Sequence, residues 1–149
     1  MGYPLYGHEL SEVLSPIEAG LGYFVKVDKG EFTGRSALMK QKDERPKKKI
    51  VVFKMNGKCP PPRQGYEVYN NLEARKEARS VASAGFKPQD TDPVIGTVTS
   101  GTQSPSLSCG IGMAQVHIDR AREGTAIDIS IRGKRYSATV CKKPLYKKQ

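Results

Sequence analysis

The sequence is poor in the residues that build metal and thiol sites. It contains no tryptophan, two histidines and three cysteines in 149 residues. The cysteines, Cys59, Cys109 and Cys141, form no CxxC motif and are odd in number, so they predict reduced thiols rather than a disulfide framework or a zinc site. We therefore expect no metal cofactor.

The shortage of histidine also argues against a hydrolase triad. His8 and His117 lie far apart in the chain, and neither is accompanied by a GxSxG motif. His117 stands between Val116 and Ile118, which is typical of a half-exposed strand residue. His8 follows a Tyr-Gly turn and could face a site, although a structural or solvent-exposed role is the favoured interpretation.

Long apolar segments are absent as well. No run approaches 18 apolar residues and no signal-peptide-like segment is present, so we expect a soluble chain without a membrane partner, in the cytoplasm or, in a eukaryote, the mitochondrial matrix. The mean hydropathy is −0.54, but the apolar runs at 50–53 and 127–131 argue against disorder. The length suits one domain, or one small domain with part of another.

Acidic residues are outnumbered, 15 against 25 lysines and arginines, which leaves a net charge of +10. The positive charge is concentrated in 45–49 (RPKKK) and 142–148 (KKPLYKK), with a diffuse share on Arg75, Lys76 and Arg79. This surplus predicts attraction to a polyanion or to an acidic protein, and a merely solvated surface is the alternative. Nucleic acid is not favoured, because stacking aromatic residues are sparse.

The first third of the chain mixes helical and extended patterns. Ser15 and Pro16 resemble an N-cap and a first helical residue, so a short helix is expected to end at Gly20 or Gly22. Alternation over 23–27 predicts a strand, and helix formers over 34–42 predict a second helix. Pro46 and the basic run indicate a linker, which places a domain boundary between 1–45 and 46–149.

From residue 50 the chain consists of short β-like runs broken by glycine. They are IVVFKM, GYEVY, VIGTVTSG, IGMAQVHI, AIDISIRG and KRYSATVC. Six strands at this spacing predict a small barrel or sandwich, with a hairpin turning at Arg132 and Gly133. The segment at about 70–93 is too long for a hairpin loop, so it is interpreted as an insertion with a polar helix over 71–84.

Candidate ligand residues are concentrated in 2–38. Glu18 lies at an expected helix start, where it either contacts a ligand or caps the helix. Tyr6 and Tyr23 either stack on a flat ring or pack in a core. The hydroxyl- and glycine-rich segment 95–107 could bind an anion through its backbone, but a turn that satisfies its own backbone is favoured.

Several motifs in order carry a resemblance to a known family. They are YPLYGHEL, SPIEAGLGYFVKVDKGEFTGRSAL, RQGYEVY, IGTVTSGTQSPSL, IGMAQV and IRGKRYSATVCKKPLYK. Together they resemble the C-terminal part of the glycine cleavage system T-protein, a tetrahydrofolate-dependent aminomethyltransferase. The resemblance implies a mainly β fold with some α structure, in which a Greek-key β-barrel follows the end of a ferredoxin-like α+β domain.

The resemblance also implies a reaction and a set of binding residues. The aminomethyl group on the lipoyl arm of the H-protein would pass to tetrahydrofolate, with release of ammonia and without a metal. The implied binding residues are Tyr6, Glu18, Tyr23, Lys26, Arg35 and Tyr146. Tyr23 replaces a tryptophan common in the family, Tyr146 matches a tyrosine that reaches toward the folate, and Lys26 and Arg35 would meet the glutamate tail or the H-protein.

The chain departs from the family pattern because the N-terminal domain, with the aspartate thought to assist the chemistry, is not in the sequence. We therefore expect no activity from the chain alone, whether it is a truncated product or a subunit that complements a separate N-terminal half. Related enzymes that oxidise dimethylglycine or sarcosine stay open, whereas an iron–sulfur assembly factor is disfavoured by the lack of a KGCYxGQ-like motif. The alternative from another class is a free-standing basic β-barrel that binds RNA or an acidic protein.

Overall fold

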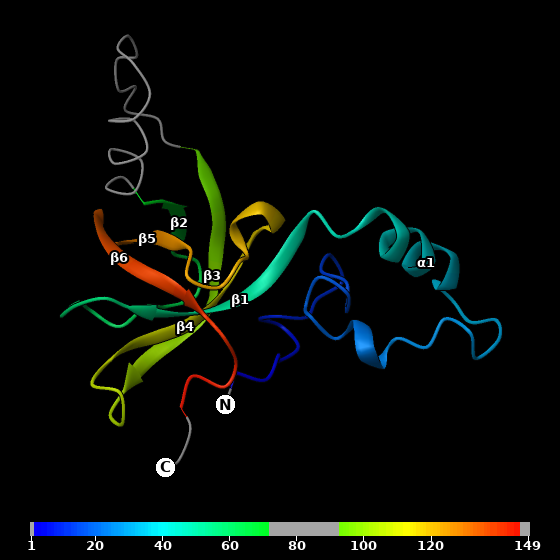
Figure 1. Ribbon diagram of the computed structural model, residues 1–149, viewed down its shortest axis with the longest axis horizontal. Helices are drawn as coiled ribbons and strands as arrows, with labels where there is room; N and C mark the ends of the chain where they lie inside the picture. Colours follow the sequence, from blue (N-terminus) through cyan, green and yellow to red (C-terminus); the bar gives the residue numbers. More distant parts are fainter. Residues whose placement is uncertain (1, 72–92, 147–149) are drawn as a thin grey trace, which may run out of the picture.

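The computed structural model describes residues 2–71 and 93–146, and it shows a β-barrel with an arm on one side (Figure 1). The arm, residues 5–46, carries a 3-10 turn η1 (Gly22–Phe24) and a helix α1 (Arg35–Glu44). The helix expected over 71–84 and the basic residues at 75–79 lie outside the described residues. The described chain is mainly β, as predicted.

Six antiparallel strands close the barrel. They are β1 (Lys48–Met55), β2 (Glu67–Asn70), β3 (Val94–Ser104), β4 (Cys109–His117), β5 (Ala126–Ile131) and β6 (Lys134–Cys141), with a 3-10 turn η2 (Ile118–Arg120) after β4. Their order around the barrel is β1-β4-β3-β2-β5-β6. Since β2, β3 and β4 are sequential neighbours and β1 lies beside β4, the connection is a Greek key, and the prediction of a Greek-key barrel is confirmed.

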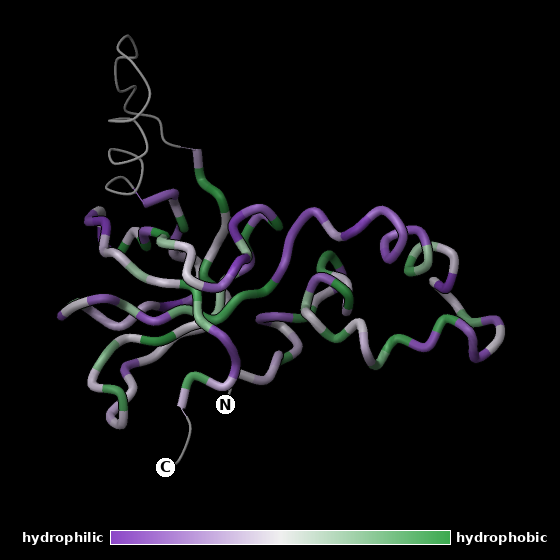
Figure 2. Tube along the Cα trace, viewed as in Figure 1, coloured by the Kyte–Doolittle hydropathy of each residue, from purple (hydrophilic) through white to green (hydrophobic). Residues whose placement is uncertain are grey.

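Strand β1 is buried on both faces. Val51, Phe53 and Met55 point into the barrel and join its core, together with Ile127 and Ile129 of β5. Figure 2 shows β1 changing from hydrophilic at its start to hydrophobic along its length. A strand with water on one face would alternate apolar and polar residues, whereas this continuous apolar run marks a strand covered on each side.

The outer face of β1 is covered by the arm. Ile50 and Val52 pack with Met113 of β4 and with Leu14 and Ala19 of the arm in a second hydrophobic cluster. Strand β6 pairs with β1 only over Val52–Met55, and beyond it the Ile50 N–H donates to the Glu18 carbonyl oxygen at 2.9 Å. The arm therefore continues both the packing and the hydrogen bonding of the barrel wall.

Two sequence-based expectations for the arm are wrong. The segment after Ser15 forms hydrogen-bonded turns rather than a helix, and 23–27 forms η1 and coil rather than a strand. No neighbouring strand pairs with 23–27 in the described chain, and an unpaired segment of this length cannot hold a strand. The second helix is confirmed as α1, since the prediction of 34–42 matches Arg35–Glu44.

The predicted hairpin between β5 and β6 is confirmed. Arg132 and Gly133 occupy the turn, and both have positive φ, 52° and 78°. Positive φ at both central residues is the geometry of a two-residue hairpin turn that matches the twist of the strands.

Glycine at 112 makes room for the largest side chain of the barrel core. A Cβ at Gly112 would lie 2.6 Å from both the Phe53 Cζ and the Ser100 carbonyl oxygen. Phe53 is fully buried, so its ring cannot retreat into solvent. The backbone of β4 can approach the ring this closely only without a side chain.

We predict that Gly112→Ala lowers the free energy of unfolding by about 1–3 kcal/mol, because the added methyl overpacks the core against a ring and a backbone carbonyl. Urea unfolding followed by circular dichroism measures the change. Gly57→Ala is the matched control, since a Cβ there meets no atom within 4 Å. Equal stability of the two variants would contradict the packing argument.

Candidate functional site

The six residues selected from the sequence do not form one site. Tyr23, Lys26 and Arg35 lie on the arm, whereas Tyr146 lines a cleft on the outer face of the barrel. Glu18 is engaged in a turn, and Tyr6 is exposed in the first loop of the arm. The arm and the cleft are therefore two separate surfaces.

On the arm, Tyr23 presents an exposed ring. Its side chain is 81% exposed, its ring meets Phe24 edge-on at 5.5 Å, and the Lys26 ammonium lies 4.7 Å from its centroid. Core packing of Tyr23 is thus wrong. An exposed aromatic pair with a cation over one ring is a surface for contact with a flat or apolar partner.

The guanidinium of Arg35 is already hydrogen-bonded within the arm. Its Nε donates to the Val27 carbonyl oxygen at 2.6 Å, and its Nη1 donates to Glu31 Oε1 at 2.9 Å. These bonds tie the loop before α1 to the first turn of the helix. Arg35 therefore acts in this structure as a clamp on the arm, and its proposed contact with a ligand requires these bonds to open.

Glu18 completes a capping box with Ser15. The Ser15 hydroxyl accepts from the Glu18 N–H at 3.1 Å, and Glu18 Oε2 accepts from the Ser15 N–H at 3.1 Å. The reciprocal pair satisfies two backbone donors at the start of the turn. The capping interpretation of Glu18 thus accounts for its carboxylate here, while a ligand contact stays a proposal.

We predict that Ser15→Ala destabilises the protein by about 1 kcal/mol, because the capping acceptor is lost. Chemical denaturation measures this loss. Ser36→Ala is a suitable control, since Ser36 is an exposed residue within α1. If Ser15→Ala matches the control, the capping box contributes nothing to stability.

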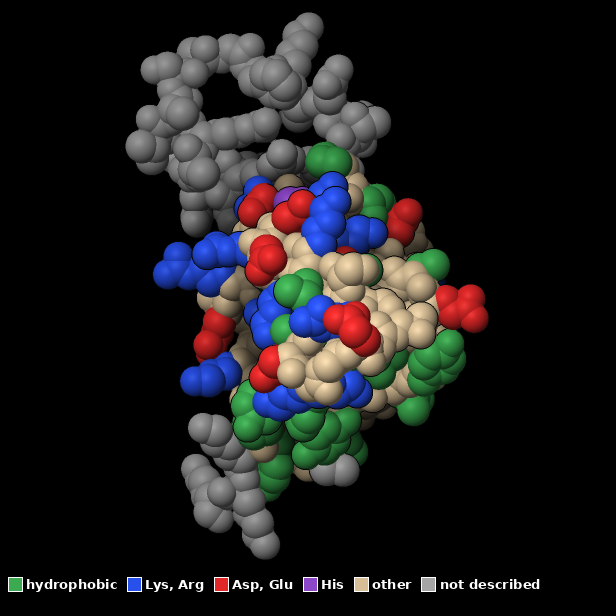
Figure 3. Space-filling model, turned by 90° about the vertical axis from the view of Figure 1, so that its right-hand side faces the viewer, with side chains coloured by type: hydrophobic (Ala, Val, Ile, Leu, Met, Phe, Trp, Pro, Cys, Tyr) green, Lys and Arg blue, Asp and Glu red, His purple; other side chains and the backbone are tan. Residues whose placement is uncertain are grey.

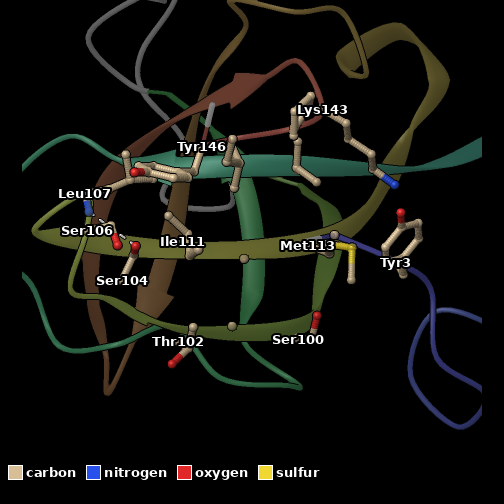
Figure 4. A pocket seen from close by; sticks show the side chains of 16 residues that line it. Tyr3, Ser100, Thr102, Ser104, Ser106, Leu107, Ile111, Met113, Lys143 and Tyr146 are labelled. Carbon is tan, nitrogen blue, oxygen red and sulfur yellow. Dashed lines mark hydrogen bonds between the residues drawn. The ribbon is translucent and has the colours of Figure 1, made fainter. Parts of the chain in front are cut away.

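A cleft of about 660 Å³ lies on the outer face of β1, β4 and β3 (Figure 4). Its floor includes Ile111 and Met113 of β4 and Val52 of β1. The wall is formed by residues from both ends of the described chain, 2–3 and 143–146. Figure 4 shows Tyr146 at one end near Leu107, and Lys143 with Tyr3 at the other.

The hydroxyl-rich segment singled out in the sequence forms one side of this cleft. Ser104 Oγ accepts from the Leu107 N–H at 3.3 Å, which is drawn as a dashed line in Figure 4. This turn thus satisfies part of its own backbone, as favoured from the sequence. Ser100 and Thr102 make no hydrogen bond through their hydroxyls to the described residues, so these groups are available to a ligand.

A buried carboxylate lies behind the cleft. Glu9 is 1% exposed, its Oε2 accepts from the Leu5 N–H at 3.1 Å, and its Oε1 has no hydrogen-bond partner among the described residues. Next to it, His8 is a surface residue whose Nδ1 donates to the Thr99 carbonyl oxygen at 3.1 Å. The bond of His8 attaches the start of the arm to β3, whereas that of Glu9 stays within the arm.

The electrostatics of the cleft centre on Lys143. Desolvation lowers the pKa of its ammonium, the nearby Glu9 carboxylate raises it, and Lys49 lowers it again. The net direction is down from the ordinary lysine value of 10.5. The negative charge of Glu9 therefore helps to keep Lys143 protonated.

We predict that Glu9→Gln lowers the pKa of Lys143 further, because the negative charge that raises this pKa is removed. NMR titration of the lysine side chains measures the shift. Glu12→Gln, at an exposed position, is the control. An unchanged Lys143 pKa in Glu9→Gln would show that the two charges do not interact.

The remaining sequence candidates have no shared site. His117 is half-exposed at the end of β4, as expected, with its Nδ1 3.1 Å from Asp119 Oδ2. All three cysteines are free, and burial raises the pKa of Cys59 and of Cys141. In residues 2–71 and 93–146, no three His, Cys, Asp or Glu side chains come together as a metal site.

The structure also answers the membrane question for helices. Within the described ranges, no helix is both long and apolar enough to span a bilayer.

Sequence reasoning missed the cleft and its cation. The sequence places Lys143 in a basic run and gives no sign that Tyr3 lies beside it. No sequence signal brings residues 2–3 next to 143–146, because their proximity arises from closure of the barrel. The parts of the cleft that the sequence does indicate are the hydroxyls of 95–107 and Tyr146.

The fold and the cleft together define a class of protein: a closed six-stranded Greek-key barrel whose outer face, joined by an arm, carries a ligand-sized cleft. Comparison with known protein families then shows to which family this barrel belongs. The chain belongs to the family described as the glycine cleavage T-protein C-terminal barrel domain, whose family model matches residues 48–147.

Curated relatives agree with this family. The chain is 43% identical over 145 residues to an aminomethyltransferase of Alkaliphilus oremlandii, covering 96% of this chain and 33% of the relative. It is 42% identical over 147 residues to an aminomethyltransferase of Caldanaerobacter subterraneus, covering 99% of this chain and 34% of the relative. The chain thus spans about a third of the length of these relatives and corresponds to their C-terminal part.

A solved structure shows the same fold. The glycine cleavage system aminomethyltransferase T from Bartonella henselae superposes with a TM-score of 0.76 at 25% identity, over 96% of this chain and 35% of that one.

Proposed function

We propose that this chain forms the barrel and arm of a tetrahydrofolate-dependent aminomethyltransferase of the glycine cleavage system. The reaction passes the aminomethyl carbon from the lipoyl group of the H-protein to tetrahydrofolate, and it yields methylenetetrahydrofolate, ammonia and the dihydrolipoyl protein. The observation that carries the proposal is the family match over the whole barrel, whose outer face carries the cleft.

The exposed apolar side chains of the arm support the proposal that this chain works together with a further polypeptide segment. Tyr6, Val13, Tyr23 and Phe24 are 69%, 93%, 81% and 73% exposed, and all belong to the arm. Figure 3 shows apolar side chains gathered toward the lower part of the arm-side face, below a zone where acidic and basic side chains intermix. Concentrated exposed apolar surface of this kind marks an interaction site.

The residues of the cleft fit part of a folate. A reduced pterin with its aminobenzoyl-glutamate is a flat aromatic body that ends in carboxylates, and the cleft combines two tyrosines, an apolar floor and an ammonium. On the arm, the exposed Tyr23 ring provides a second flat surface. No described carboxylate stands free in the cleft to move protons, since Glu9 is buried behind it.

The proposed division of labour follows from these contacts. The chain binds and orients the co-substrate and excludes water from one side of it, which lowers the entropic cost of bringing the reacting groups together. Proton transfer at the reacting nitrogens falls to residues outside this chain. The proposal thus includes that the chain alone is inactive and acts with an N-terminal part, in one polypeptide or as a separate half.

The test is a calorimetric titration of tetrahydrofolate into the chain, with and without the separately expressed N-terminal two thirds of the Alkaliphilus relative. We predict saturable heat and methylenetetrahydrofolate formation from lipoylated H-protein only in the combined sample, because the site requires both parts. The N-terminal part alone is the control. Equal binding by the chain alone would refute its incompleteness, and silence in every sample would refute the folate function and favour a basic barrel that binds an anionic partner.

A further inference from the structure

The cleft contains a cation that neither the sequence motifs nor the family match assigns. We propose that Lys143 is the anion-recognising residue of this cleft, and that the cleft takes a ligand with a flat or apolar body and a terminal carboxylate. The body would lie over Ile111 and Met113, and the carboxylate would meet the Lys143 ammonium. The choice of ligand rests on the proposed function.

Lys26 and Arg35, the two cations that the resemblance implies for an anionic ligand, make other contacts within the arm. Arg35 donates to Val27 and Glu31, and Lys26 lies over the Tyr23 ring. Neither residue lines the cleft. Lys143 does line it, which makes this lysine the cation placed to receive a ligand there.

Lys143 is an exposed residue that lies beside Gly2 at the wall of the cleft. Its stem packs near Gly2, where a Cβ would lie 3.9 Å from Cδ and 4.0 Å from Cε. Its ammonium has no ion pair or hydrogen bond with any residue in the described ranges. An exposed ammonium without a partner among the described residues is available to an anion, with which it forms a charge-assisted hydrogen bond.

The layout of the cleft gives a ligand a direction. In Figure 4 the Lys143 ammonium and the Tyr3 ring lie at one end, and Tyr146 and Leu107 lie at the other, with Ile111 and Met113 between them. An apolar floor with a charge at one end binds molecules whose body is apolar and whose charge is terminal.

The charges around Lys143 leave the site positive. The groups that act on its ammonium are Glu9 and Lys49, one negative and one positive, so the three together carry a charge of about +1. Glu9 Oε2 is bound to the Leu5 N–H on the buried side. The carboxylate of Glu9 therefore supports the protonated lysine without occupying the cleft.

The experiment compares two probes on this chain by NMR titration: N-(4-aminobenzoyl)-L-glutamate, which carries carboxylates, and 4-aminobenzamide, which carries none. We expect the first probe to shift resonances of Ile111 and Met113, and Lys143→Met to weaken its binding about tenfold, as for one hydrogen bond to a charged group. Binding of 4-aminobenzamide should be the same in both proteins.

Lys142→Met is the matched control, because it removes the same charge from the neighbouring exposed residue, which does not line the cleft. Absence of binding of the first probe by the unaltered chain, equal binding by Lys143→Met, or an equal loss in Lys142→Met would each overturn the proposal. Circular dichroism of each variant shows that the fold is kept.

The outcome is separable from that of the proposed function. If the combined sample binds tetrahydrofolate equally well with Lys143→Met, the assignment of Lys143 fails while the folate function stands. If the combined sample never binds tetrahydrofolate but the probe binds through Lys143, the folate function fails and the carboxylate cleft stands.

Discussion

The rest of the structure depends on the burial of β1 from both sides. On its inward face, β1 packs Val51, Phe53 and Met55 into the barrel core. On its outward face, it packs Ile50 and Val52 against the arm. Each face buries side chains that are worth about 1.5–3 kcal/mol apiece when removed from water. A single strand thereby fixes the position of the arm relative to the barrel.

The functional surfaces follow from this arrangement. Residues 2–3, which precede the arm, meet the segment after β6 on the outer face of β4 and enclose the cleft with it. The same packing leaves the opposite side of the arm exposed, with Tyr23 and Phe24 on its surface. One face of the arm thus packs on the barrel, and the other is exposed to solvent.

The closed barrel also explains how a chain that spans about a third of the length of its relatives forms a folded unit. The barrel has its own core and no free strand edge, since its six strands close on themselves. Its interior depends on glycines such as Gly112 that let backbone approach aromatic and sulfur side chains.

The sequence by itself determined the six strands, the Arg132–Gly133 turn, helix α1 and the family, because these rest on local alternation, turn chemistry and ordered motifs. It misplaced a helix after Ser15 and a strand at 23–27, where local propensity lacked a tertiary partner. Which residues share a site was decided only by the tertiary structure. Arg35 became a clamp and Glu18 a cap through hydrogen bonds, whereas Lys143 and Tyr146 reached the cleft because barrel closure brings residues separated by most of the chain into contact.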